Sequence, residues 1–306
     1  MKNRSFSLLL FNHTAGNLAD ILYITVIVLH IYELTGSVLA SALFPFVRVI
    51  ANFASSFVSP VLLGRVPLVR MMSVTRIGEV SAMAGLALFA VSGLDAVWLI
   101  LSIVFATSFI QGWANPVTYS LIPRLVDEAG LSRANGMLGT AREITSVVGW
   151  LLGGIGAVWL GVPNMLAVSA ILFASGAVAV QGLRVRAGGE PAEGKSEGGS
   201  PADKWTAIRL GWSELLRNRT ARFITIMDAI EGFGYTVFIG SFTLTFVEIQ
   251  LNRGPEYWGY INASYFVGMI AGGVLVTAAA KWLNQRLPLA MALGSLGYGA
   301  ADVVPA

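Results

Sequence analysis

Four ionisable residues stand out inside long apolar stretches of this 306-residue sequence: Asp20, Arg48, Asp228 and Glu231. Charges in such surroundings are costly, and most of them pair with one another or line a path for ions or substrates. Asp20 is near the middle of the first stretch, and Arg48 is about ten residues into the second. At about 1.5 Å of rise per helical residue, the two side chains reach similar depths, so we expect an ion pair. That pair could serve transport or could be purely structural.

Asp228 and Glu231 are three positions apart and therefore share one face of a helix. Two carboxylates this close in a medium of low dielectric constant cannot both ionise cheaply, so one is expected to hold a proton. This arrangement suits a proton carrier. The alternative is that both lie near the inner membrane surface, bonded to Arg222 or to water.

The segments that carry these charges have the composition of membrane-spanning helices. Hydrophobic residues make up 55% of the chain and charged residues 12%, whereas soluble domains are about 25% charged. A span needs about 20 apolar residues. The sequence predicts an all-α polytopic membrane protein with nine spans, the last of them weak, at 6–33, 38–63, 71–93, 96–120, 137–160, 163–183, 221–247, 257–280 and 287–305.

The distribution of basic residues predicts the orientation of the spans. With the N-terminus inside, every Lys and Arg falls on the cytoplasmic side except Arg48, within a span, and Arg253, outside. This count includes Arg76 and Arg142, and it obeys the positive-inside rule. We therefore expect a multi-pass protein of the cell membrane with a cytoplasmic N-terminus.

A polar linker rich in Gly, Glu, Ser and Lys follows the sixth span. It divides the chain into a six-helix bundle at 1–183, a cytoplasmic linker at 184–220 and a partial second bundle at 221–306. Apolar residues at helical spacing from Trp205 to Leu216 predict a helix, either lying on the membrane or packed on the protein. Residues 189–196 satisfy the phosphate-loop pattern, but no strand precedes them, so we attribute the match to chance.

The segment from Asn115 to Asn135, NPVTYSLIPRLVDEAGLSRAN, resembles a segment of the macrolide-efflux branch of the major facilitator superfamily. The first span resembles the first helix of that branch, with its acid at Asp20 and the ending Leu34 to Ser37. The resemblance implies twelve helices in two halves of six, so this chain would hold one complete half and about three helices of the other. We therefore expect a truncated member.

Two further motifs of that superfamily are present in altered form. The loop after the second span keeps Arg65 and Arg70 of a gating motif but lacks its aspartate. The fifth span keeps Gly149, Gly153 and Gly154 of the antiporter motif, with Trp150 in place of the proline. The glycines would also allow simple close packing of two helices, which is compatible with the family role.

The resemblance implies a secondary transporter, a drug:proton antiporter that exports amphipathic drug-like molecules and confers multidrug or macrolide resistance. An exporter of a native metabolite or lipid and a non-transporting remnant stay open. We expect no cofactor beyond the proton gradient, a lipid bilayer as surroundings, no nucleic acid partner and a monomer. No cysteine and only two histidines are present, which excludes Cys- and His-based metal sites. No nucleophile motif indicates an enzyme.

Overall fold

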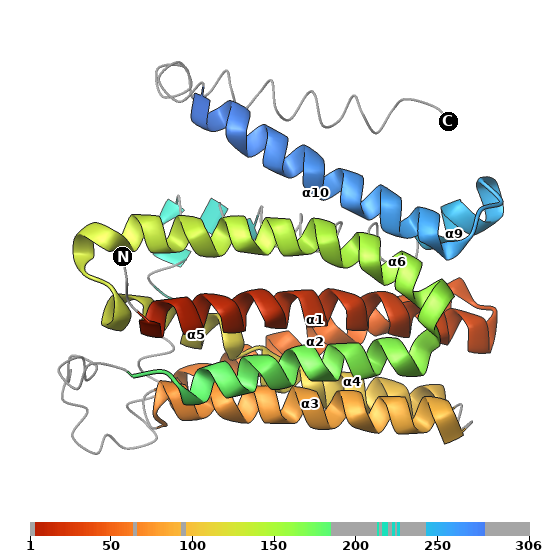
Figure 1. Ribbon diagram of the computed structural model, residues 1–306, viewed down its shortest axis with the longest axis horizontal. Helices are drawn as coiled ribbons and strands as arrows, with labels where there is room; N and C mark the ends of the chain where they lie inside the picture. The colour runs from red at the N-terminus through yellow and green to blue at the C-terminus, as the bar shows by residue number, and fades with distance from the viewer. Residues whose placement is uncertain are drawn as a thin grey trace.

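The computed structural model describes residues 4–63, 66–92, 96–184, parts of 213–226 and 243–278. Within these ranges the long elements are all α-helices, and Figure 1 shows them lying side by side as a bundle. They are α1 (Arg4–Thr35), α2 (Val38–Leu63), α3 (Leu68–Ser92), α4 (Val97–Gln111), α5 (Ala114–Leu125), α6 (Glu128–Gln181) and α10 (Pro255–Ala278). The short α9 (Thr243–Thr245) runs into the π-helix η2 (Phe246–Gln250).

Five stretches of the described residues are long and apolar enough to cross a membrane. They run Arg4–Thr35, Leu39–Ser59, Leu68–Ser92, Val97–Leu125 and Arg133–Gln181. The fourth joins α4 to α5 through a turn at Gly112 and Trp113. These stretches confirm the prediction of an all-helical polytopic protein.

Helix α6 contains the two predicted spans 137–160 and 163–183, which meet at a tight turn. At this turn Gly161 adopts a φ of 73°, and a helix runs directly up to it and directly away from it. Such a φ suits glycine, and Pro163 lacks the N–H that a regular helix needs there. At about 1.5 Å per residue, the 49-residue apolar stretch is more than twice the roughly 30 Å hydrocarbon thickness. Figure 1 shows the chain turning back at this kink, so α6 forms two antiparallel legs.

Helix α1 occupies the centre of the bundle, between the two legs of α6. Half of its residues are buried, among them the fully enclosed Tyr23, Ile27 and Ile31. The outward faces of the other helices carry large exposed apolar side chains, including Trp98 at 78% and Trp159 at 85% exposure. Apolar surface of this extent is stable against lipid and unfavourable against water.

The glycines of α6 lie where this helix meets α1 and α10. A Cβ atom on Gly149 would meet Ile21, and one on Gly153 would meet Thr25, both in α1. Gly154 faces Gly259 of α10, where a Cβ would lie 3.2 Å from the opposite Cα atom. Helix α10 corresponds to the predicted span 257–280, and the glycine pair lets its backbone approach α6 closely.

Several predicted features fall outside the described residues. These are most of the predicted span 221–247, the span 287–305, nearly all of the linker with its amphipathic segment, and the predicted site residues Arg65, Asp228 and Glu231.

Candidate functional site: a charged cavity within the helix bundle

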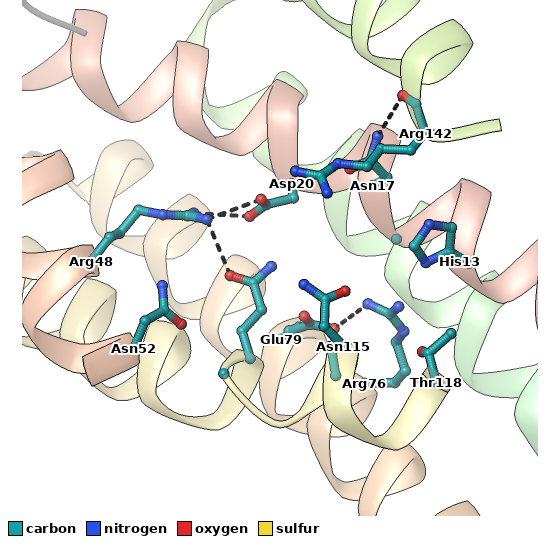
Figure 2. Close-up of a pocket in the computed structure, with 14 residues that line it drawn as sticks. His13, Asn17, Asp20, Arg48, Asn52, Arg76, Glu79, Asn115, Thr118 and Arg142 are labelled. Atoms are coloured by element: carbon teal, nitrogen blue, oxygen red, sulfur yellow. Dashed lines mark hydrogen bonds and ion pairs between the residues drawn. The ribbon is translucent and has the colours of Figure 1, made fainter. Parts of the chain in front are cut away.

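A cavity of about 400 Å³ lies among α1 to α6, in the N-terminal part of the bundle. All six helices contribute to its wall, and Figure 2 shows their polar side chains converging on it. The wall contains three arginines, two carboxylates, one histidine and several amides and hydroxyls. These residues are Arg48, Arg76, Arg142, Asp20, Glu79, His13, Asn17, Asn52, Gln111, Asn115 and Thr118.

Asp20 of α1 and Arg48 of α2 form an ion pair on one side of this cavity. Two parallel hydrogen bonds join them, from Arg48 Nη1 to Asp20 Oδ1 at 2.9 Å and from Nη2 to Oδ2 at 3.0 Å. The Gln111 side chain of α4 accepts a further bond from Nη2 at 3.2 Å. The rings of Tyr23 and Phe44 stand 5.8 Å from the guanidinium carbon, within range of cation–π attraction. The arrangement ties three helices together at the level of the cavity.

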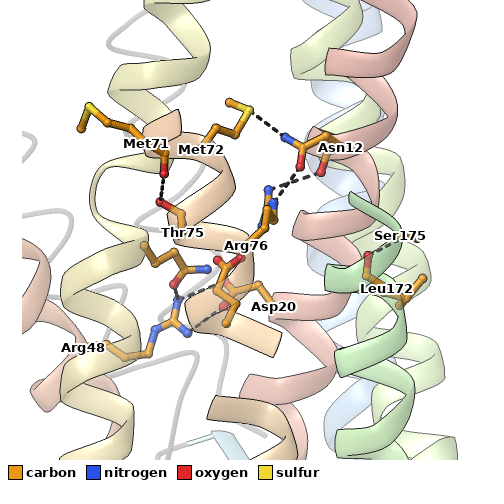
Figure 3. Close-up of polar contacts among 11 residues, drawn as sticks. Asn12, Asp20, Arg48, Met71, Met72, Thr75, Arg76, Leu172 and Ser175 are labelled. Carbon is orange, nitrogen blue, oxygen red and sulfur yellow. Dashed lines mark hydrogen bonds and ion pairs between the residues drawn. The ribbon is translucent and has the colours of Figure 1, made fainter. Parts of the chain in front are cut away.

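A second ion pair, Arg76 and Glu79 of α3, lies deeper in the protein. Arg76 Nη1 donates to Glu79 Oε2 at 2.7 Å, and the two side chains are 8% and 0% exposed. Arg76 also donates to the side-chain oxygen of Asn12 in α1 at 2.7 Å and to the Asn12 carbonyl at 3.3 Å (Figure 3). The Phe173 ring of α6 stands 5.5 Å from the guanidinium carbon. Arg76 is therefore held by α1, α3 and α6 together.

Gly16 of α1 makes room for this arginine. A Cβ atom at Gly16 would overlap the guanidinium group of Arg76. Glycine at this position thus allows a buried cation to lie directly against the backbone of the central helix.

Arg76 and Arg142 lie inside the bundle, whereas the orientation argument counted both among the basic residues of the cytoplasmic side. Arg76 lies in the third turn of α3 with 6% exposure, and Arg142 lines the cavity from α6. Their neighbours explain the difference, because partners such as Glu79 and Asn12 allow a cation to stay inside the bundle. The spacing of Arg76 and Glu79 at i and i+3 within a predicted span was the signal that could have identified them.

Helices α1 and α6 are also joined on the Arg142 side of the cavity. The Asn17 amide donates to Thr145 Oγ1 at 2.6 Å and to the Arg142 carbonyl at 3.2 Å. The side chain of Arg142 points toward the cavity in Figure 2. This leaves a cationic group on the wall beside the Asp20–Arg48 pair.

The structure brings together only part of the predicted site. Asp20 and Arg48 are in contact, whereas Asp228 and Glu231 lie outside the described residues. Arg70 is an exposed residue in the first turn of α3 and is not among the residues that line the cavity. Gly149, Gly153 and Gly154 pack helices and do not line the cavity.

The chemistry that this cavity supports is recognition of polar groups and movement of charge. Among the described residues, no three His, Cys, Asp or Glu side chains are grouped as metal ligands would be. Paired charges inside an apolar bundle are expensive, and such groups commonly mark substrate or proton pathways through a membrane.

Comparison with known proteins agrees with a transport role. The family described as Major Facilitator Superfamily matches residues 6–305. The uncharacterised MFS-type transporter YfmI of Bacillus subtilis is 25% identical over 304 residues, covering 99% of this chain and 74% of the relative. The uncharacterised MFS-type transporter YjbB of the same species is 29% identical over 311 residues, covering 99% of this chain and 73% of the relative. Together with the multi-pass bundle and its charged interior, these matches show that the chain belongs to the major facilitator superfamily of membrane transporters.

Proposed function

We propose that the protein is a proton-coupled secondary transporter of the cell membrane that exports amphipathic drug-like small molecules. The observation that supports this proposal is a cavity lined by two ion pairs and several amides inside an otherwise apolar bundle. The polar part of a substrate would bind to these side chains, and its apolar part would lie against the surrounding helices. The macrolide-efflux branch and the cytoplasmic N-terminus stay predictions.

The polar character of the wall favours a second candidate, an exporter of a native metabolite. Cations outnumber carboxylates on the described wall, with Arg48, Arg76 and Arg142 facing Asp20 and Glu79. A surplus of arginine favours a substrate that carries a carboxylate or phosphate, because guanidinium groups bind both with paired hydrogen bonds. Substrate charge therefore separates the two candidates.

A vesicle assay tests the proposal. Everted membrane vesicles that contain the protein are energised so that their interior becomes acidic, and a pH-sensitive dye reports the gradient. A proton antiporter should dissipate the gradient when its substrate is added. The added compounds are a macrolide, a cationic dye and a set of hydroxylated carboxylic acids.

Dissipation by the macrolide or the dye would support drug export, and dissipation by the acids alone would support the metabolite candidate. Vesicles without the protein are the control. Accumulation of any of these compounds that persists after an uncoupler has collapsed the gradient would contradict proton coupling.

A further inference from the structure

Glu79 differs from the other acid of the cavity in how its oxygens are satisfied. Oε2 accepts one hydrogen bond from Arg76, whereas Oε1 is buried and has no hydrogen-bond partner among the described residues. Both carboxylate oxygens of Asp20, by contrast, are bonded to Arg48. Glu79 is 1% exposed and belongs to the cavity wall, so its unsatisfied oxygen is not compensated by bulk water.

A carboxylate that holds a full negative charge in such a place is under-stabilised. An ionised carboxylate can accept about four hydrogen bonds, and leaving a buried charged acceptor unsatisfied is costly. A proton on Oε1 would remove the charge from this buried side chain and with it the need for further hydrogen-bond donors. We propose that Glu79 binds and releases a proton at Oε1, and that this step belongs to the coupling of proton and substrate movement. The proposal rests on the proton-coupled function proposed above.

The surroundings of Glu79 allow both protonation states. When Oε1 is protonated, Arg76 loses its carboxylate partner but keeps its two bonds to Asn12 and its place against Phe173. The cation therefore stays in position. In the described part of the cavity, the other titratable or charged groups are His13 and Asp20 from α1, Arg48 from α2 and Arg142 from α6, while α4 and α5 contribute neutral side chains.

Protonation of Glu79 would raise the formal charge of this wall by one. The net positive charge of the wall would then be larger, so the protonated state should bind a cationic substrate less tightly than the ionised state, which is the competition that proton antiport requires. A ligand that distinguishes the two states in this way is linked to the proton, which is the thermodynamic requirement for coupling. The step needs no other reactant, because one proton is bound at Oε1 and later released.

Infrared difference spectroscopy of the purified protein in lipid nanodiscs tests this proposal without a known substrate. The carbonyl stretch of a protonated carboxylic acid should appear as pH is lowered. Labelling with ¹³C-glutamate should shift the band, which separates Glu79 from Asp20. The component of the band that comes from Glu79 should be lost in Glu79→Gln, whereas Glu33→Gln, a control on an exposed glutamate of α1, should leave the whole band unchanged.

A second variant keeps the test decisive if Glu79→Gln fails to fold. Glu79→Asp retains an acid, and its band should no longer respond to the glutamate label. The proposal is overturned if the wild-type protein shows no titrating glutamate band, if Glu79→Gln leaves that band undiminished, or if the label shifts the band as much in Glu79→Asp as in the wild-type protein. These readouts are independent of transport, so failure of the vesicle assay and failure of this inference are distinguishable.

Discussion

At the scale of single residues, the Asp20–Arg48 pair is the contact that joins the first two helices at the cavity. Its side chains are 17% and 15% exposed, so removal of one partner leaves the other charge in a largely dry site. Loss of one partner of a fully buried pair costs about 3–5 kcal/mol, and the cavity should reduce this value here because it gives the remaining charge partial hydration.

A double-mutant cycle tests this coupling. Asp20→Asn and Arg48→Gln should each lower the thermal unfolding temperature in detergent. The double variant should lower this temperature by less than the sum of the two single decreases. Each single variant leaves one largely buried charge without its partner, whereas the double variant removes both charges. Strictly additive losses would show that the two residues act independently.

A second prediction at this scale concerns Asp228 and Glu231, which lie outside the described residues. If one of them carries a proton, Asp228→Asn or Glu231→Gln should abolish proton-driven export and leave substrate exchange without a gradient intact. The amides keep the size of each side chain and remove its proton site. Pumping by both single variants and by the double variant, with unchanged pH dependence, would place the carrier elsewhere, with Glu79 or Asp20 as candidates.

At the scale of elements, α10 packs against α6 of the N-terminal bundle with their backbones close together. Gly154 and Gly259 face each other at this crossing, and Trp150 packs edge-on against Trp258 with ring centroids 5.1 Å apart. Trp150 stands where the resembled motif has proline. The contact between Trp150 and Trp258 therefore lies at a position where the proline of the resembled motif would restrict the backbone of α6.

Substitution of Gly259 tests this crossing. A Cβ atom at Gly259 would lie 2.6 Å from the Trp150 carbonyl oxygen, a backbone atom that cannot move aside without shifting α6. Gly259→Ala should therefore destabilise the protein by about 1–3 kcal/mol, the usual cost of overpacking.

Gly268→Ala is the matched control, because nothing lies within 4 Å of a Cβ atom at that position of α10. Alanine there should be neutral or stabilising by up to about 1 kcal/mol through helix propensity. Thermal unfolding in detergent measures both variants. Equal effects of the two substitutions would show that α6 and α10 do not cross at the glycine pair.

At the scale of the whole molecule, orientation in the membrane decides which face of the cavity meets the cytoplasm. The chain has no cysteine, so a single introduced cysteine reports its own location without background. Ser196→Cys, in the linker, should resist an impermeant thiol reagent in intact cells and react after the cells are permeabilised. Reaction of this cysteine in intact cells would contradict the predicted topology.

The amino-acid sequence by itself determined the class of the protein and most of its helices. Long apolar runs predict spans because a bilayer accepts only backbone that bonds to itself, and the helices α1, α2, α3 and α10 lie close to the predicted ranges. Depth along two neighbouring helices was sufficient to predict that Asp20 and Arg48 meet, since short connections make successive helices antiparallel.

Only the tertiary structure decided which other charges face inward. Whether Arg76, Glu79 and Arg142 point to lipid, to water or to a cavity depends on how α3 and α6 are rotated, and rotation is set by packing against helices distant in sequence. The bonds from Arg76 to Asn12 and the space left by Gly16 exist only once α1 lies against α3. The pairing of Gly154 with Gly259 likewise arises from contact between remote segments, which no local pattern specifies.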